Sequence, residues 1–125
     1  MTENDLSKII LDICFDIHKQ LGPGLYESVY EEIICHELSL EGYRFDRQKA
    51  VPVIWNGKKL ELGFRADIIL EDKLLLEIKS VENLLAVHKK QTLTYLKLTG
   101  IKLGLLINFK EALLKDGIHR LVNNL

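Results

Sequence analysis

The chain has 125 residues, of which 47% are hydrophobic and 28% charged, and its formal net charge at pH 7 is -1. That length suits a single domain over residues 1–125, and the near-zero charge argues against a tight non-specific DNA-binding protein, so any polyanion binding must come from a local patch. No apolar stretch approaches the roughly 20 residues of a membrane span, and the first residues are acidic, unlike a signal peptide, which predicts a cytoplasmic protein without a membrane partner.

Two amphipathic helices are predicted first. Apolar residues recur at helical spacing over residues 6–21, after an expected cap at Asn4, and the Gly-Pro-Gly of residues 22–24 ends this helix. A second helix is expected over residues 25–41, before Gly42. Its expected apolar stripe consists of Val29, Ile33, Ile34 and Leu38.

The pattern then changes to that of an antiparallel sheet. Apolar residues alternate toward the end of a strand that starts at Phe45, and they continue over residues 60–70 in a second strand. Pro52 favours an edge position for the first strand, and Gly63 is expected to bend the second. A third strand follows over residues 73–79, which completes a three-stranded meander. The tight turns are expected at residues 56–57, Asn-Gly, and 71–72, Glu-Asp.

The third strand carries the most informative motif. Residues 74–79 form an apolar run that nevertheless places Glu77 and Lys79 two positions apart, on one face of a buried strand. Burying two charges costs several kcal/mol each unless they are paired or bind something. Pairing around the preceding turn puts Asp67 opposite Leu76 or Glu77, so two carboxylates converge. Convergent carboxylates are typical Mg²⁺ ligands, and Lys79 beside them would orient water or neutralise developing charge.

The Glu-x-Lys spacing by itself is a weak signal, because a chain of this composition contains about one such match by chance. Glu71-Asp72-Lys73 is a second match in this chain. It falls in a predicted turn and needs no function, whereas Glu77 and Lys79 fall in an apolar strand. The surrounding sequence therefore singles out the second pair.

Two further groups of polar residues accompany this motif. Glu27 opens the second helix, where a carboxylate is favourable with the helix dipole in any case. A third helix is expected over residues 83–98, ending at Gly100. Its steps of three and four put His88, Gln91 and Tyr95 on one face, which is explained either by a binding function or by ordinary surface polarity. The remaining strands are expected at residues 103–109 and, as an edge strand, 118–122.

These residues resemble the PD-(D/E)XK nuclease superfamily, whose core runs helix, three antiparallel strands, helix, strand, with an Asp and a Glu-x-Lys on the second and third strands. The Gly-Leu-Tyr-Glu-Ser-Val-Tyr of residues 24–30 looks like the motif that names the small GxxExxY proteins within it. The resemblance covers most of the chain. It implies an α/β, restriction-endonuclease-like fold with an extra N-terminal helix. The proline that usually precedes the motif aspartate is replaced by Ala66.

The resemblance also implies roles for individual residues. The catalytic set is Glu27, Asp67, Glu77 and Lys79, the metal site is Asp67, Glu77 and the Ile78 carbonyl, and the substrate contacts are Arg65, His88, Gln91 and Tyr95. Arg65 also lies two residues before Asp67 and so on its face of the strand.

The function expected from these residues is a Mg²⁺-dependent phosphodiesterase, with Mn²⁺ as a substitute, that cleaves nucleic acid, DNA being favoured over RNA. One alternative is a catalytically silent nuclease fold that serves as a protein-interaction or dimerisation module. A small-molecule or nucleotide hydrolase with the same metal chemistry is the third. An edge strand and a small domain are compatible with a homodimer.

Overall fold

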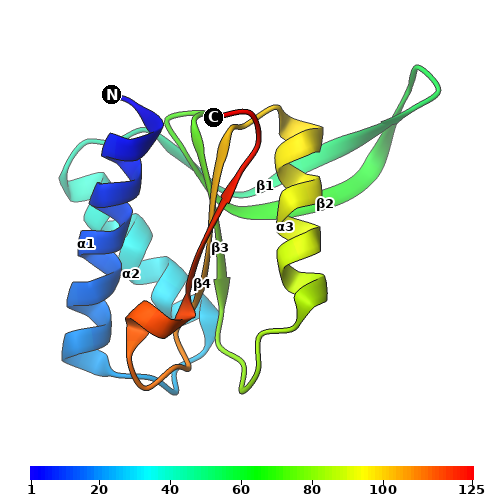
Figure 1. Ribbon diagram of the computed structural model, residues 1–125. Coiled ribbons are helices and arrows are strands. Elements are labelled where there is room, and N and C mark those ends of the chain that lie inside the picture. The colour runs from blue at the N-terminus through cyan, green and yellow to red at the C-terminus, as the bar shows by residue number, and fades with distance from the viewer.

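Helices cover both faces of a central sheet, with α1 and α2 on one side and α3 on the other (Figure 1). The computed structural model describes the backbone of residues 1–125 and the side chain of every residue except Leu62. The predicted element order and the α/β class are confirmed. The elements are α1 (Glu3–Leu21), α2 (Glu27–Leu40), β1 (Phe45–Trp55), β2 (Lys58–Leu70), β3 (Leu74–Lys79), α3 (Ala86–Thr99), β4 (Leu103–Asn108), the 3₁₀ helix η1 (Leu114–Gly117) and β5 (Ile118–Val122).

The described backbone forms a five-stranded sheet in the order β1-β2-β3-β4-β5. Neighbouring strands run antiparallel except β3 and β4, which are parallel and are joined across one face by α3. The predicted meander of β1, β2 and β3 and the edge positions of β1 and β5 are confirmed. Asn56 and Gly57 turn the first hairpin with φ values of 49° and 78°, and Glu71 and Asp72 turn the second with 51° and 54°. The first is a two-residue loop between the paired Trp55 and Lys58, for which such left-handed conformations are required, whereas three residues, 71–73, separate the paired Leu70 and Leu74 in the second.

Three details of the helices differ from the sequence prediction. Thr2, not Asn4, caps α1, because its hydroxyl accepts the Asp5 N–H while the Asp5 carboxylate accepts the Thr2 N–H. Val29, expected in the apolar stripe of α2, is 38% exposed, and the neighbouring Tyr30 is buried in the core instead. The start of α3 is Ala86, three residues later than expected. None of the described helices combines the length and apolar character needed to cross a membrane.

The sheet separates two apolar layers. The larger layer lies between the sheet and the helices α1 and α2, and the smaller one lies under α3 (Figure 1). Even-numbered residues of β3 face the larger layer, and Leu75 faces the smaller one, as strand alternation requires. Glu77 and Lys79 therefore point to the α3 side of the sheet. The central part of the larger layer comprises Leu6, Ile10, Tyr30, Ile34, Ile68, Leu74, Leu76, Ile78, Leu105, Ile107 and Phe109.

The strands β2 and β3 separate partway along the sheet. Their shared register runs from Leu70↔Leu74 to Ile68↔Leu76 and then ends, while β2 stays paired with β1 up to the hairpin turn. The β1–β2 register shifts between Val51 and Val53, opposite Gly63. A Cβ atom at Gly63 would lie 1.8 Å from the Val51 carbonyl oxygen, so only glycine fits there. The predicted bend at Gly63 is thus confirmed.

Candidate functional site

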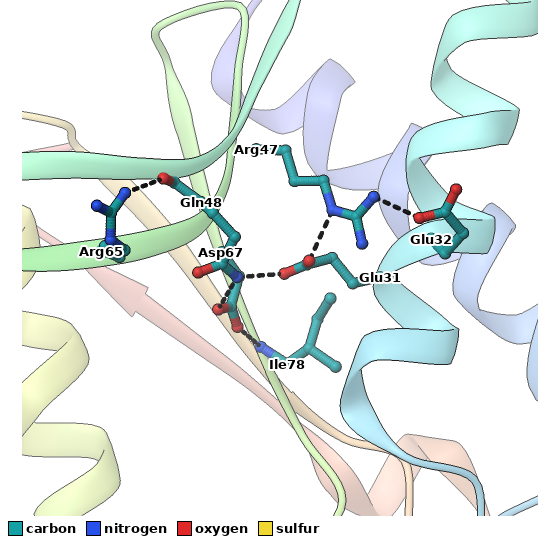
Figure 2. Close-up of polar contacts among 7 residues, drawn as sticks. All are labelled: Glu31, Glu32, Arg47, Gln48, Arg65, Asp67 and Ile78. Atoms are coloured by element: carbon teal, nitrogen blue, oxygen red, sulfur yellow. Dashed lines mark hydrogen bonds and ion pairs between the residues drawn. The ribbon is translucent and has the colours of Figure 1, made fainter.

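Asp67 and Glu77 lie side by side where β2 and β3 separate. The Asp67 Oδ2 atom accepts the Ile78 N–H at 2.8 Å, and the Asp67 N–H lies 3.4 Å from the Glu77 Oε1 atom. The Asp67 carboxylate thus satisfies a backbone donor that the strand ladder no longer reaches. This bond fixes the carboxylate at the fork between the two strands, next to Glu77 (Figure 2 shows the bond to Ile78).

The Glu77 carboxyl is unusually hard to ionise. Its residue is only 5% exposed, and burial, followed by the negative charge of Asp67 and a hydrogen bond to that side chain, raises the pKa of Glu77 to about 9. The charge of Lys79 acts in the opposite direction on this pKa but does not outweigh these effects. At neutral pH Glu77 therefore keeps a proton that a divalent cation would replace.

The end of β3 supplies two more polar groups. Lys79 follows Glu77 on the same face and is partly buried, and its backbone carbonyl accepts the Phe109 N–H at 2.8 Å. The N–H and C=O of one strand residue face the same neighbour, so the Ile78 carbonyl points to the edge where Asp67 binds the Ile78 N–H. An ammonium group and a main-chain oxygen thus accompany the two carboxylates.

A hydrogen-bonded network, of which only Glu31 is buried, ties Asp67 to helix α2 through strand β1 (Figure 2). Glu31, only 6% exposed, accepts a hydrogen bond from Arg47 Nε at 2.7 Å and another from Gln48 Nε2 at 2.7 Å. The same Gln48 amide donates to the Asp67 Oδ1 atom at 3.1 Å. Arg47 also pairs with Glu32, and these bonds, led by the one to Glu31, raise the pKa of the Arg47 guanidinium above its ordinary value. Asp67 is therefore held from three elements.

The main chain at Gln48 is specialised for this contact. Its φ angle is 52°, in the left-handed region that is costly for a residue with a side chain. Its carbonyl oxygen accepts the Arg65 Nη1–H at 3.1 Å. Arg65, predicted as a substrate contact, is exposed, and Figure 2 shows its guanidinium at the Gln48 carbonyl.

Sequence reasoning missed Glu31 and Gln48. Glu31 had a readable signal, because it precedes Ile34, Cys35 and Leu38 by three, four and seven residues and therefore lies within the apolar stripe of α2. A carboxylate at a core position of a helix indicates a buried partner. Gln48 had no such signal, because its role depends on a positive φ in the middle of a strand.

Glu27 contacts the chain directly after β3, two residues beyond the Ile78 N–H that Asp67 binds. Its Oε2 atom accepts the Ser80 N–H at 3.1 Å, and the Ser80 hydroxyl donates to the Leu25 carbonyl at 2.8 Å. The Tyr30 hydroxyl donates to the Gly22 carbonyl at 2.7 Å and accepts the Leu25 N–H. These bonds fasten the start of α2 to the segment that follows Lys79. Beside them lies a pocket of ≈ 450 Å³ lined by Gly24, Leu25, Tyr26, Glu27, Ser28, Ser80 and Lys110.

The three polar residues predicted to share one face of α3, which are His88, Gln91 and Tyr95, lie in different environments. The His88 Nδ1 atom accepts the Leu85 N–H at 3.0 Å and so caps the start of the helix. Gln91 is exposed. Tyr95 stacks on Phe64 with ring centroids 3.5 Å apart. Burial raises the pKa of Tyr95, and the charges of Glu77 and Asp67 raise it further, which places the phenol within electrostatic range of the carboxylate pair.

The donor set at the fork fits a hard divalent cation. In the part of the chain that the structure describes, no three side chains of His, Cys, Asp or Glu gather closely enough to enclose a metal ion. Asp67 and Glu77 are nevertheless a pair of adjacent carboxyl groups beside the Ile78 carbonyl edge. Mg²⁺ typically takes one or two protein carboxylates and fills its other positions with water and substrate oxygens.

Comparison with known proteins gives one result for the family. A protein-family model described as the PD-(D/E)XK nuclease superfamily matches residues 4–121 of the chain. No significant match was found among curated proteins or among solved structures.

Proposed function

The chain belongs to the PD-(D/E)XK nuclease superfamily, with the restriction-endonuclease-like fold of that group, and we propose that it is a Mg²⁺-dependent nuclease that hydrolyses phosphodiester bonds, preferentially in DNA. The observation that carries this proposal is the Asp67–Glu77 pair with Lys79 on the same face. A nearly buried glutamate that keeps its proton at neutral pH is costly in a purely structural role. The same arrangement is useful where a cation displaces the proton.

The roles follow from where each side chain lies. Asp67 and Glu77, with the Ile78 carbonyl, would hold the cation, which supplies Lewis-acid polarisation of a phosphoryl oxygen and a water of lowered pKa. Lys79 would neutralise negative charge that develops on the phosphate, because its ammonium group follows Glu77 on the same face. Arg65 is exposed beside β1 and would bind a neighbouring phosphate. Gln91 and Tyr95 would contact substrate from α3.

Within the superfamily, we propose that the chain is one of the GxxExxY proteins. Its motif residues have physical roles that support this assignment: Gly24 has a φ of 104°, Tyr30 fastens the loop before α2, and Glu27 binds the Ser80 N–H. Glu27 would then act on substrate that extends past Lys79 into the pocket beside Ser80. His88 would reach substrate only through its Nε2 atom, because Nδ1 caps α3.

The proposal is tested by calorimetric titration of Mg²⁺ and Mn²⁺ into the wild type and Asp67→Ala, followed by cleavage assays on the same samples with single- and double-stranded DNA. We expect metal binding and cleavage in the wild type and the loss of both in the variant. Bound metal should also raise the melting temperature, because a ligand of the folded state at 100 times its Kd adds about 2.7 kcal/mol to the free energy of unfolding.

Asp46→Ala is the matched control. Asp46 lies on the neighbouring strand β1 and pairs only with the exposed Lys49, so its loss should leave metal binding and cleavage unchanged. If the wild type binds neither metal, the proposal is wrong and the catalytically silent interaction module is favoured. If it binds metal but cleaves no nucleic acid, the small-molecule hydrolase is favoured.

A further inference from the structure

The β1–β2 hairpin forms a two-stranded ribbon that extends past α3, away from the rest of the molecule (Figure 1). The ribbon beyond the register shift at Gly63 pairs Val53 with Leu60, Ile54 with Lys59 and Trp55 with Lys58. A ribbon of two strands by itself is only marginally stable in water, and a binding partner would stabilise this projecting part.

The end of this ribbon is both apolar and cationic. Trp55 is 66% exposed and Ile54 is 59% exposed, although both are large hydrophobic residues. Lys58 and Lys59 beside them are exposed, and neither forms an ion pair with any side chain that the structure describes. Such residues on a projecting element indicate a contact surface.

The charge of the ribbon differs from that of the whole chain. Residues 49–65 contain four Lys or Arg and one Glu, a net charge of +3, whereas the chain as a whole carries -1. A polyanion is therefore attracted locally to this element. The lysines at its end also repel one another across any interface that brings the tips of two copies together, which argues against a second copy of the chain as the partner.

We propose that the β1–β2 ribbon is an arm that binds the major groove of duplex DNA outside the cleavage site. The B-form major groove, about 12 Å wide, admits a two-stranded ribbon, whereas the major groove of duplex RNA is too narrow. Because successive strand residues point to opposite faces, Trp55 shares one face of the ribbon with its partner Lys58, and Ile54 shares the other with Lys59. Trp55 would contact the apolar edges of bases, and the long side chains of Lys58 and Lys59 would contact phosphates at the groove edges. This inference rests on the proposed nuclease function and narrows its substrate to duplex DNA.

The ribbon also sets a length for the substrate. Lys59 precedes Asp67 by eight residues on β2, and at about 3.3 Å per residue this separation is at most about 26 Å. DNA rises about 3.4 Å per base pair, so the arm would contact the duplex within about 8 base pairs of the scissile phosphate. A duplex that ends nearer than this to the cleavage site would miss the arm.

Trp55 is the only tryptophan of the chain, so its fluorescence reports directly on the arm. The experiment titrates the full chain, without divalent cations, with duplexes of DNA and of RNA of about 24 base pairs, roughly three times the expected span. Cleavage is not needed for this readout. The Asp67→Ala variant should give the same fluorescence response, so failure of the nuclease proposal and failure of the arm are distinguishable.

The test variant is Lys58→Ala combined with Lys59→Ala, and the matched control is Lys19→Ala combined with Lys115→Ala. Both control lysines are exposed and lie on α1 and η1, on the other side of the sheet from α3. We expect DNA to change the Trp55 emission, RNA to change it at least about tenfold more weakly, and the test variant to weaken DNA binding about tenfold. The slope of log affinity against log salt should fall by about 2 in that variant alone.

Three results would overturn the proposal: no change of emission with DNA, an equal response to duplex RNA, or an equal loss of affinity in the control variant. An emission shift that follows protein concentration without DNA, together with a dimer in sedimentation, would assign the ribbon to a second copy and also overturn it.

Discussion

The chain contains the same Glu-x-Lys pattern twice, and the two copies have opposite environments. Glu71 and Asp72 turn the chain between β2 and β3, where both carboxylates pair with the exposed Arg44. Lys73 donates to the backbone carbonyl of Met1 at 2.7 Å. Each charged side chain of this turn thus has a polar partner and is at least partly exposed to water.

The second copy, six residues further on, lies inside the sheet. Glu77 is 5% exposed, and its nearest charged neighbour is another carboxylate, Asp67. The comparison teaches that the spacing of residue types carries little information by itself, whereas the apolar strand around Glu77 buries its carboxyl group beside that of Asp67 and makes it hard to ionise. The experiments below test this difference, and the first two use the exposed copy as the control for the buried one.

The largest effect is expected from Glu77→Gln. Glutamine resembles the protonated glutamate that burial favours, so the fold should be kept, but it cannot replace the negative charge that holds a cation. Loss of the metal removes several kcal/mol of transition-state stabilisation, and cleavage of DNA should fall by about 10³-fold or more. The measurement is the cleavage rate at saturating Mg²⁺, with circular dichroism to confirm the fold.

Glu71→Gln is the control for this change, because it makes the same substitution in the other Glu-x-Lys copy. It should cleave DNA at the wild-type rate. Equal losses in the two variants would mean that the buried copy has no special role.

The second-largest effect is expected in the free energy of unfolding, which should depend on pH in the absence of metal. The pKa of Glu77 is about 9 in the folded protein, against an ordinary value near 4.5 when unfolded, so between these values the folded state binds the extra proton. The free energy of unfolding should therefore fall as the pH rises from about 5 to 9, by at most about 1.4 kcal/mol per pH unit. Urea denaturation in EDTA at several pH values measures this slope.

Glu77→Gln should flatten that slope, because the amide does not titrate, while Glu71→Gln should keep it. A wild-type slope that survives in Glu77→Gln would show that another group is responsible.

Much of the fold could be predicted because its signals are local. The Asn-Gly hairpin turn, the bend at Gly63 and the edge position of Pro52 each follow from the backbone preferences of one or two residues. The convergence of Asp67 and Glu77 follows from counting residues around one turn. Such inferences need no knowledge of distant parts of the chain.

The rest depends on contacts between distant residues. The Asn108 side chain binds both the N–H and the carbonyl of Val81 and so fixes the chain before α3, and the His88 ring accepts the Leu85 N–H at the observed start of the helix. Gln48, which donates to Asp67, has a φ of 52° in the middle of a strand. Neither contact has a sequence signature. The hydrogen bonds that hold the Asp67 carboxylate in place could therefore be found only in the structure.

The hydrogen bond from Gln48 to Asp67 predicts a smaller effect, on Mg²⁺ affinity, for Gln48→Ala. The substitution removes the amide that bridges Glu31 and Asp67, so the Asp67 carboxylate loses one of the bonds that orient it. Mg²⁺ affinity should fall by about 10-fold, as is typical when a hydrogen bond to a metal ligand is lost. Calorimetric titration measures the affinity, and the pH optimum of cleavage should stay unchanged.

Gln20→Ala is the control for this variant, because Gln20 donates a comparable bond to Asp16 on the surface of α1. It should bind Mg²⁺ as the wild type does. Unchanged affinity in Gln48→Ala would mean that the bridge does not position Asp67.

The smallest effect is expected from Arg44→Ala, which removes the cation that both carboxylates of the exposed copy share. The Arg44 side chain is 70% exposed, and ion pairs of this kind contribute about 0–1 kcal/mol because water and salt screen them. The free energy of unfolding should therefore change by less than about 1 kcal/mol, and Mg²⁺ affinity should not change at all. Urea denaturation and calorimetry measure the two quantities. A marked loss of Mg²⁺ affinity in Arg44→Ala would contradict the contrast, because it would mean that the turn and the buried pair act as one electrostatic unit.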